Sequence, residues 1–147
     1  MHHDDPGGYV EDFGASIAPA GDLDRDGITD VAIGCSEFGF DRGDSYAAEL
    51  FSGRDGRRLL SIDTRYKSVT VGPAADFDGD GCLDLPIGLP EDEVVFVMDG
   101  AALRRRLGGA HRIPIEGSVL LTLRRGSYPS GSPTDAFPAL PPPSCGR

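Results

Sequence analysis

The sequence predicts an all-β chain built from two related units of short strands. Two acidic stretches, residues 22–30 and 76–84, share the pattern D-x-D-x-D-G-x-x-D. A short apolar run broken by Gly or Pro follows each stretch, which indicates a buried strand and not a helix. The 147-residue chain also holds 21 Gly, 12 Pro and no Trp, a composition typical of short strands joined by many turns.

The similarity between the two units extends beyond the acidic stretches. At an offset of 54 residues, Ser16-Ile17-Ala18 recurs as Thr70-Val71-Gly72, and the apolar run 31–34 recurs as 85–88. Later, Leu50-Phe51-Ser52-Gly53 resembles Val97-Met98-Asp99-Gly100 at a shorter offset, because the first unit has a longer loop around residues 38–45. Self-similarity at this period indicates a repeat architecture such as the blades of a β-propeller.

The acidic stretches have the chemistry of a Ca²⁺ loop. Four carboxylates within nine residues repel one another unless a cation neutralises them, and Ca²⁺ takes six to eight oxygen ligands. A glycine at the sixth position suits a sharp turn with positive φ, and the next residue offers its backbone carbonyl. The expected ligands are the side chains of Asp22, Asp24, Asp26 and Asp30 with the Ile28 carbonyl, and those of Asp76, Asp78, Asp80 and Asp84 with the Cys82 carbonyl.

Two other interpretations of these stretches are weaker. An EF-hand loop needs a bidentate Glu at its twelfth position and a helix after it, whereas the twelfth positions here are Ile33 and Ile87. Dockerin-type loops fail the same test. Asp and Gly are also ordinary surface-turn residues, but two copies with the same fourth Asp and the same following strand favour metal binding.

The order of these segments resembles the FG-GAP repeat, the blade unit of the integrin α-subunit β-propeller. Phe13-Gly14 matches the "FG", and the acidic loop and apolar run follow in the expected order. The "GAP" is less faithful, as Gly34-Cys35-Ser36 and Gly88-Leu89-Pro90, and Lys67-Ser68 replaces the second "FG". The resemblance implies blades of four antiparallel strands, with a structural Ca²⁺ in the loop between the first two strands of each blade.

The resemblance divides the chain into four parts. We expect a flexible N-terminus over 1–11, one blade over 12–66, a second blade with additional strands over 67–125, and a disordered tail rich in Pro, Ser and Gly over 126–147. Two blades make no closed ring, since propellers have about four to eight. An incomplete propeller leaves an unfilled core and open edges, which further blades of a longer chain or self-association would cover.

The net charge and the terminal segments limit the possible partners and the possible location of the protein. The formal net charge of −10 argues against a nucleic-acid partner. No membrane span and no signal peptide are visible, but the family and the weak affinity of extracellular Ca²⁺ modules favour a secreted or cell-surface protein. The three cysteines, Cys35, Cys82 and Cys145, leave at least one without a disulfide partner within the chain.

The sequence therefore predicts a non-enzymatic Ca²⁺-binding repeat module of an adhesion or interaction protein, with a protein or glycan ligand. The alternative is a scaffold piece of a propeller-containing polysaccharide-active enzyme. No nucleophile, phosphate loop or acid–base pair supports catalysis in this chain. Arg42-Gly43-Asp44 spells a tripeptide that integrins recognise, but motifs this short occur often by chance.

Overall fold

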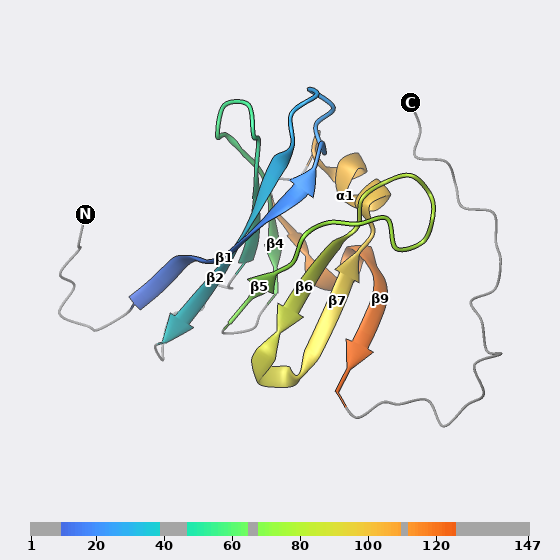
Figure 1. Cartoon of the computed structure of the whole chain (residues 1–147). Helices are drawn as coiled ribbons and strands as arrows, with labels where there is room; N and C mark the ends of the chain where they lie inside the picture. The colour runs from blue at the N-terminus through green and yellow to red at the C-terminus, as the bar shows by residue number, and fades with distance from the viewer. Residues whose placement is uncertain (1–9, 39–46, 65–67, 110–111, 126–147) are drawn as a thin grey trace, which may run out of the picture.

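The computed structural model describes residues 10–38, 47–64, 68–109 and 112–125, which form two β-sheets and one short α-helix (Figure 1). The predicted tail over 126–147, the tripeptide 42–44 and most of the predicted N-terminal segment lie outside the described residues. None of the helices among the described residues has the length and apolar character needed to cross a membrane.

The first sheet is built from the first repeat and one strand of the second. Strands β1 (Val10–Gly21), β2 (Asp30–Phe38), β3 (Ala47–Phe51) and β4 (Arg58–Asp63) follow one another as antiparallel neighbours. A fifth strand, β8 (Arg112–Pro114), pairs in parallel with β4 at the far edge.

The second sheet has four antiparallel strands in the order β5-β6-β7-β9. Its strands are β5 (Thr70–Val71), β6 (Leu85–Leu89), β7 (Val94–Met98) and β9 (Val119–Arg124). The 3-10 helix η1 (Pro90–Asp92) joins β6 to β7. Each sheet thus contains a four-stranded antiparallel unit, as the repeat predicts.

The two sheets have the same register. In the first sheet, Ile17 lies opposite Ile33, which lies opposite Glu49. In the second sheet, Val71 lies opposite Ile87, which lies opposite Phe96. The first two residues of the second row follow their counterparts by the 54-residue offset of the sequence, so the repeat is structural as well as sequential.

One hydrophobic core lies between the sheets. Side chains alternate between the two faces of a strand, and in the first sheet the inward positions include Ala32, Ala48, Leu50, Leu60 and Ile62, all fully buried. They pack in one cluster with side chains of the second sheet, namely Leu85, Ile87, Leu89, Val94, Phe96 and Met98. The two predicted units therefore pack on each other through one filled core, and the unfilled centre expected of an incomplete ring of blades stays a prediction.

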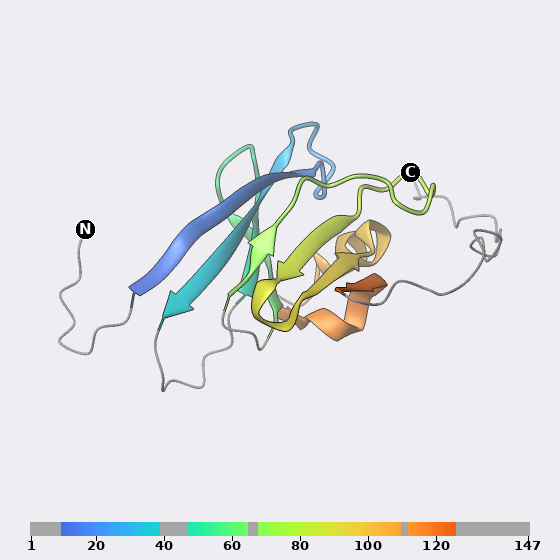
Figure 2. The same ribbon diagram turned by 60° about the horizontal axis from the view of Figure 1, so that its bottom comes forward.

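The sheets meet along the first strand of each unit. The backbone N–H of Val71 donates to the Oγ of Ser16 at 2.9 Å, and that of Ala74 donates to the carbonyl of Pro19, also at 2.9 Å. In Figure 2, β5 accordingly lies beside β1 and β2 on one side and β6 on the other.

An insertion whose helices were not expected from the sequence separates β7 from β9. It consists of helix α1 (Gly100–Arg106), strand β8 and the 3-10 helix η2 (Ile115–Ser118). Asp99 caps the helix by accepting a hydrogen bond from the N–H of Ala102 at 3.0 Å. Leu103, Ile113 and Ile115 from this insertion enter the core, so the insertion fills the opening between the outer edges of the two sheets.

The all-β class is confirmed, apart from the one short helix. The additional strands predicted in the second unit correspond to β8 and β9. The described residues form two facing sheets and no ring, so a closed propeller is not established.

Candidate metal centres

The two acidic loops occupy equivalent places in the two sheets. Loop 22–30 joins β1 to β2, and loop 76–84 joins β5 to β6 after an isolated bridge between Ala75 and Asp84. Both lie near helix α1 (Figure 1). The sixth residue of each loop, Gly27 or Gly81, has a φ of 86° or 84°, which confirms the expected left-handed turn.

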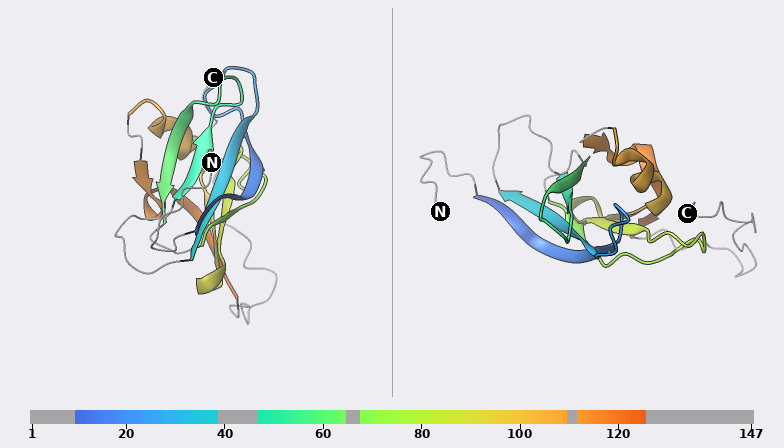
Figure 3. Two further views of the ribbon diagram at one scale, coloured as in Figure 1. Left: turned by 90° about the vertical axis from the view of Figure 1, so that its left-hand side faces the viewer. Right: turned by 90° about the horizontal axis from the view of Figure 1, so that it is seen from above.

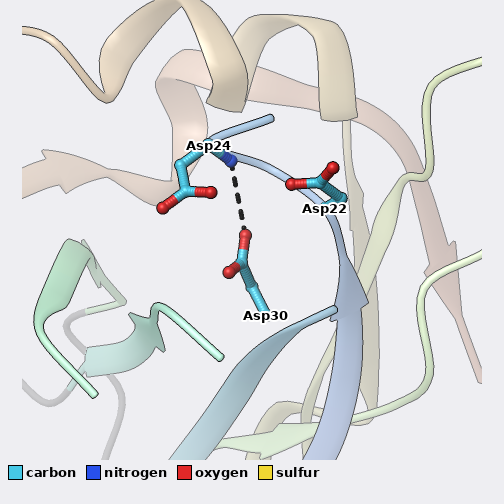
Figure 4. Close-up of side chains that lie close together, drawn as sticks. All are labelled: Asp22, Asp24 and Asp30. Carbon is cyan, nitrogen blue, oxygen red and sulfur yellow. Dashed lines mark hydrogen bonds between the residues drawn. The ribbon is translucent and has the colours of Figure 1, made fainter. Parts of the chain in front are cut away.

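Three carboxylates converge in each loop. In the first loop, Asp22, Asp24 and Asp30 each place an oxygen within 4.8 Å of the other two (Figure 4). In the second loop, Asp76, Asp78 and Asp84 do the same. The three carboxylates occupy positions one, three and nine in both loops. Their convergence is therefore a property of the repeat and not of one loop alone.

The ninth aspartate of each loop is fully buried and held by backbone donors. The Oδ2 of Asp30 accepts from the N–H of Leu23 at 2.7 Å. The Oδ2 of Asp84 accepts from the N–H of Phe77 at 2.9 Å. Burial, which disfavours the charged form, raises the pKa of both carboxyls against the opposing effect of these hydrogen bonds.

The same two carboxylates also tie each loop to the end of the third strand of its unit. The other oxygen of Asp30 accepts from the N–H of Gly53 at 3.1 Å, and that of Asp84 accepts from the N–H of Gly100 at 2.8 Å. A Cβ at Gly53 would overlap the carbonyl oxygen of Thr29, and one at Gly100 would overlap that of Leu83.

The sequence repeat pairs Gly53 with Gly100, but it did not predict that their N–H groups donate to the buried aspartates. A glycine follows the third strand in both units, and this recurrence could have predicted the contact. A position that requires Gly often lies close to another segment of the backbone.

The fifth aspartate of each loop lies outside the three-carboxylate group. Asp26 accepts from the N–H of Ile28 at 2.8 Å and from the Nε of Arg54, also at 2.8 Å. Asp80 accepts from the N–H of Cys82 at 2.7 Å. Among the described residues these two carboxylates thus brace their own loops, and their role as ligands stays a prediction.

Arginines from the turn between β3 and β4 neutralise part of the first loop. Arg57 pairs with Asp24 at 3.0 Å and Arg54 pairs with Asp26 at 2.8 Å. Burial raises the pKa of Asp26, but the hydrogen bond from Ile28 and the charge of Arg54 outweigh it, so that the pKa lies below its usual value.

The second loop has no arginine-bearing turn beside it, because helix α1 occupies that place. The ion pairs between described residues join arginines to the first loop and not to the carboxylates of the second. Burial and then the charges of Asp80, Asp76 and Asp99 raise the pKa of Asp78, against the hydrogen bond from the N–H of Asp80. The carboxylates of the two loops thus differ in their charged neighbours.

The seventh residue of each loop was expected to offer its carbonyl. The sulfur of Cys82 is buried and lies 4.0 Å from the Nη1 of Arg104, so it belongs to a contact outside the carboxylate group. The other terminal nitrogen of Arg104 donates to the Asp22 carbonyl at 2.8 Å. The carbonyls of Ile28 and Cys82 as ligands remain predictions.

The donor set fits a hard divalent cation. Carboxylate oxygens are the ligands that Ca²⁺ prefers, whereas zinc and copper sites favour His or Cys. Both groups consist of aspartates, and neither contains a His or Cys.

The chain is similar to integrin α chains. It is 34% identical to integrin alpha-E of Mus musculus over 104 residues, which is 61% of this chain and 9% of the relative. It is 33% identical to integrin alpha-E of Homo sapiens over 105 residues, 62% of the chain and 9% of the relative. It is 32% identical to integrin alpha-4 of Xenopus laevis over 108 residues, 66% of the chain and 10% of the relative.

The chain contains an integrin α-like repeat region. This integrin α-like chain spans about a tenth of the length of the relatives it matches. No family model matches it, and no solved structure shows significant similarity.

Proposed function

We propose that this integrin α-like chain is an FG-GAP-type module that binds two Ca²⁺ ions, one in each acidic loop. The observation that carries the proposal is the repeated convergence of three carboxylates at positions one, three and nine. The similarity to integrin α chains supports the assignment of both loops to one kind of repeat.

The proposed role of the ion is to stabilise the hairpin that contains it. Asp30 and Asp84 begin or adjoin the second strand of their units, and through Gly53 and Gly100 they also hold the end of the third strand. An ion between positions one, three and nine would fix the loop onto that junction. Asp26, Asp80 and the carbonyls of Ile28 and Cys82 would complete its coordination.

The proposed setting is a secreted or surface protein that recognises a protein or glycan. Extracellular Ca²⁺ modules have dissociation constants of about 10⁻⁴–10⁻³ M, which suits sites with three convergent carboxylates and extracellular Ca²⁺. The similarity to integrin α chains supports an interaction role over an enzymatic one.

Calorimetric titration of EDTA-treated protein with Ca²⁺ tests the metal proposal. We expect two binding events, with Asp24→Ala removing the first site and Asp78→Ala removing the second. Asp92→Ala is the matched control, because Asp92 is an exposed aspartate of η1 outside both loops. It should leave both events intact.

Thermal unfolding gives an independent readout of the structural role. With the dissociation constants above, roughly 10 mM free Ca²⁺ should stabilise the fold by about 1.4–2.7 kcal/mol per site. Absence of binding heat together with absence of stabilisation at this concentration would refute the proposal.

A further inference from the structure

We propose that the two acidic loops are coupled through helix α1, so that a Ca²⁺ ion bound in one loop orders the other loop and favours binding there. The inference rests on the proposed function, because it concerns how the two proposed ions influence each other. Its physical basis is a continuous line of contacts, which runs from a carboxylate of the second loop through the helix to the backbone of the first loop.

The helix begins at a carboxylate of the second loop. The Oδ1 of Asp84 accepts from the N–H of Gly100 at 2.8 Å, and Gly100 is the first residue of α1. Both residues are buried, and a Cβ at Gly100 would overlap the carbonyl oxygen of Leu83. The start of the helix therefore lies directly against the second loop, and any constraint on the Asp84 carboxylate is transmitted to it.

The last turn of the helix contacts the first loop. The Nη2 of Arg104 donates to the carbonyl of Asp22, the first ligand position of that loop, at 2.8 Å. The Nη1 of the same guanidinium lies 4.0 Å from the sulfur of Cys82 in the second loop. In the right-hand view of Figure 3, seen from above, α1 lies beside both loops. One side chain thus reaches both candidate sites.

A second contact joins the loops at residues next to their ligands. The side chain of Leu83 packs on Gly21, where a Cβ would come within 2.8 Å of the Cδ1 of Leu83. Gly21 precedes Asp22, and Leu83 precedes Asp84. A displacement of either loop is therefore felt by the other through direct packing as well as through the helix.

These contacts predict that order spreads from one loop to the other. The N–H groups of Asp26 and Gly27 both donate to the carboxylate of Asp22 at 3.0 Å, so fixing the backbone of Asp22 through Arg104 also favours these turns of the first loop. A loop that is already ordered loses less conformational entropy when it binds an ion, which raises its affinity. Coupling of this kind is reciprocal, so each ion strengthens binding of the other.

The substitution Arg104→Lys separates this contact from the charge of the side chain. Lysine keeps the positive charge but has a single ammonium group in place of the planar fork of arginine. Repulsion between the two bound cations is present in both proteins, so the difference between them isolates the contact made by the guanidinium. Arg105→Lys is the matched control, because Arg105 is an exposed residue of the same helix.

Calorimetric titration with Ca²⁺ measures the coupling factor. This factor is the overall constant for binding two ions divided by the product of the constants of the two single sites, measured in Asp78→Ala and Asp24→Ala of the same background. We expect it to be about fivefold larger with Arg104 than in Arg104→Lys, at the lower end of the range for coupled sites. Arg105→Lys should leave the factor unchanged, and circular dichroism checks that each variant is folded.

Amide hydrogen exchange detects the coupling in a loop that holds no ion. In Asp24→Ala only the second loop binds Ca²⁺, and we expect the ion to slow exchange of the Asp26 and Gly27 amides in the first loop. Arg104→Lys in that background should abolish the protection. A chain that binds no Ca²⁺ would refute the proposed function and this inference together. If both ions bind, equal coupling factors in the two proteins, or unchanged exchange at Asp26 and Gly27, would overturn this inference alone.

Discussion

At the fourth position of the acidic loops the backbone needs a left-handed conformation in both copies. Gly79 has a φ of 80°, and Arg25 has a φ of 62° in the equivalent place. For a residue with a Cβ this conformation costs about 1–2 kcal/mol, whereas Gly adopts it freely. The first loop thus holds strain that the second loop avoids.

We expect Arg25→Gly to stabilise the metal-free protein by up to about 1 kcal/mol, because relief of the strain exceeds the entropic cost of glycine. Urea unfolding in EDTA measures the change. Arg25→Ala removes the same charge but keeps a Cβ, so it should give little of this gain. Equal stabilisation by Gly and Ala would show that charge, and not backbone strain, is the cause.

The glycines that follow the third strands are close to a neighbouring carbonyl. Gly53→Ala and Gly100→Ala should each destabilise the fold by about 1–3 kcal/mol, since the added methyl group overlaps the carbonyl of Thr29 or Leu83. Gly108→Ala is the matched control, because a Cβ there meets no atom within 4 Å. Chemical denaturation compares the three variants, and equal effects would exclude close approach as the reason for these glycines.

Individual site residues were predictable to different degrees. The loop spacing predicted that the aspartates at positions one, three, five and nine converge, and those at positions one, three and nine do so, while their role as ligands stays a prediction. Spacing did not reveal that the position-five aspartate of the first loop pairs with Arg54, since that arginine is 28 residues away in the chain.

At the scale of elements, the connection after the third strand distinguishes the two sites. In the first unit it is a short turn that brings Arg57 to within 3.0 Å of Asp24. In the second unit it is helix α1, whose Arg104 instead donates to the Asp22 carbonyl. This connection thus determines whether a carboxylate of the acidic loop is already paired with an arginine.

We expect Arg57→Gln to tighten Ca²⁺ binding at the first loop by up to about fivefold, the upper range for an exposed ion pair. Calorimetry in the Asp78→Ala background isolates that site. Arg58→Gln is the control, because Arg58 pairs with Glu49 and not with the loop. Unchanged affinity in Arg57→Gln would mean that the arginine does not compete with the ion.

The predictable elements were those with local signals. Alternating or apolar runs next to acidic turns located β2 and β6, and the repeat located β1 and β5. Helix α1 was missed although Asp99 is an N-cap residue and Ala-Ala-Leu-Arg-Arg-Arg consists of good helix formers. The pairing of β8 with β4 had no local signal, because parallel neighbours come from distant parts of the chain.

At the scale of the whole molecule, the two repeats share one core and are expected to unfold together. Leu103 of helix α1 is fully buried in a cluster with side chains of both sheets. Leu103→Ala should destabilise the protein by about 2–5 kcal/mol while retaining a single cooperative transition. Leu120→Ala, at a position 37% exposed, is the control and should have a much smaller effect.

Two probes follow that transition, far-ultraviolet circular dichroism and differential scanning calorimetry. Separate transitions in Leu103→Ala would show that the sheets are independent units joined only by the chain. The number of repeats was readable from the sequence, but the shared core was not, because a pattern of apolar positions does not say which faces meet.

Because of strand β8, the repeat recognised in the sequence and the sheet formed in the structure contain different residues. Residues 112–114 belong to the second repeat by position, yet they complete the sheet of the first. If the chain were cut between the two acidic loops, the first repeat would lose β8 as the neighbour of β4. The second repeat would keep β8 without β4 to pair with. Gene duplication or shuffling that preserves this pairing would therefore have to move both repeats together.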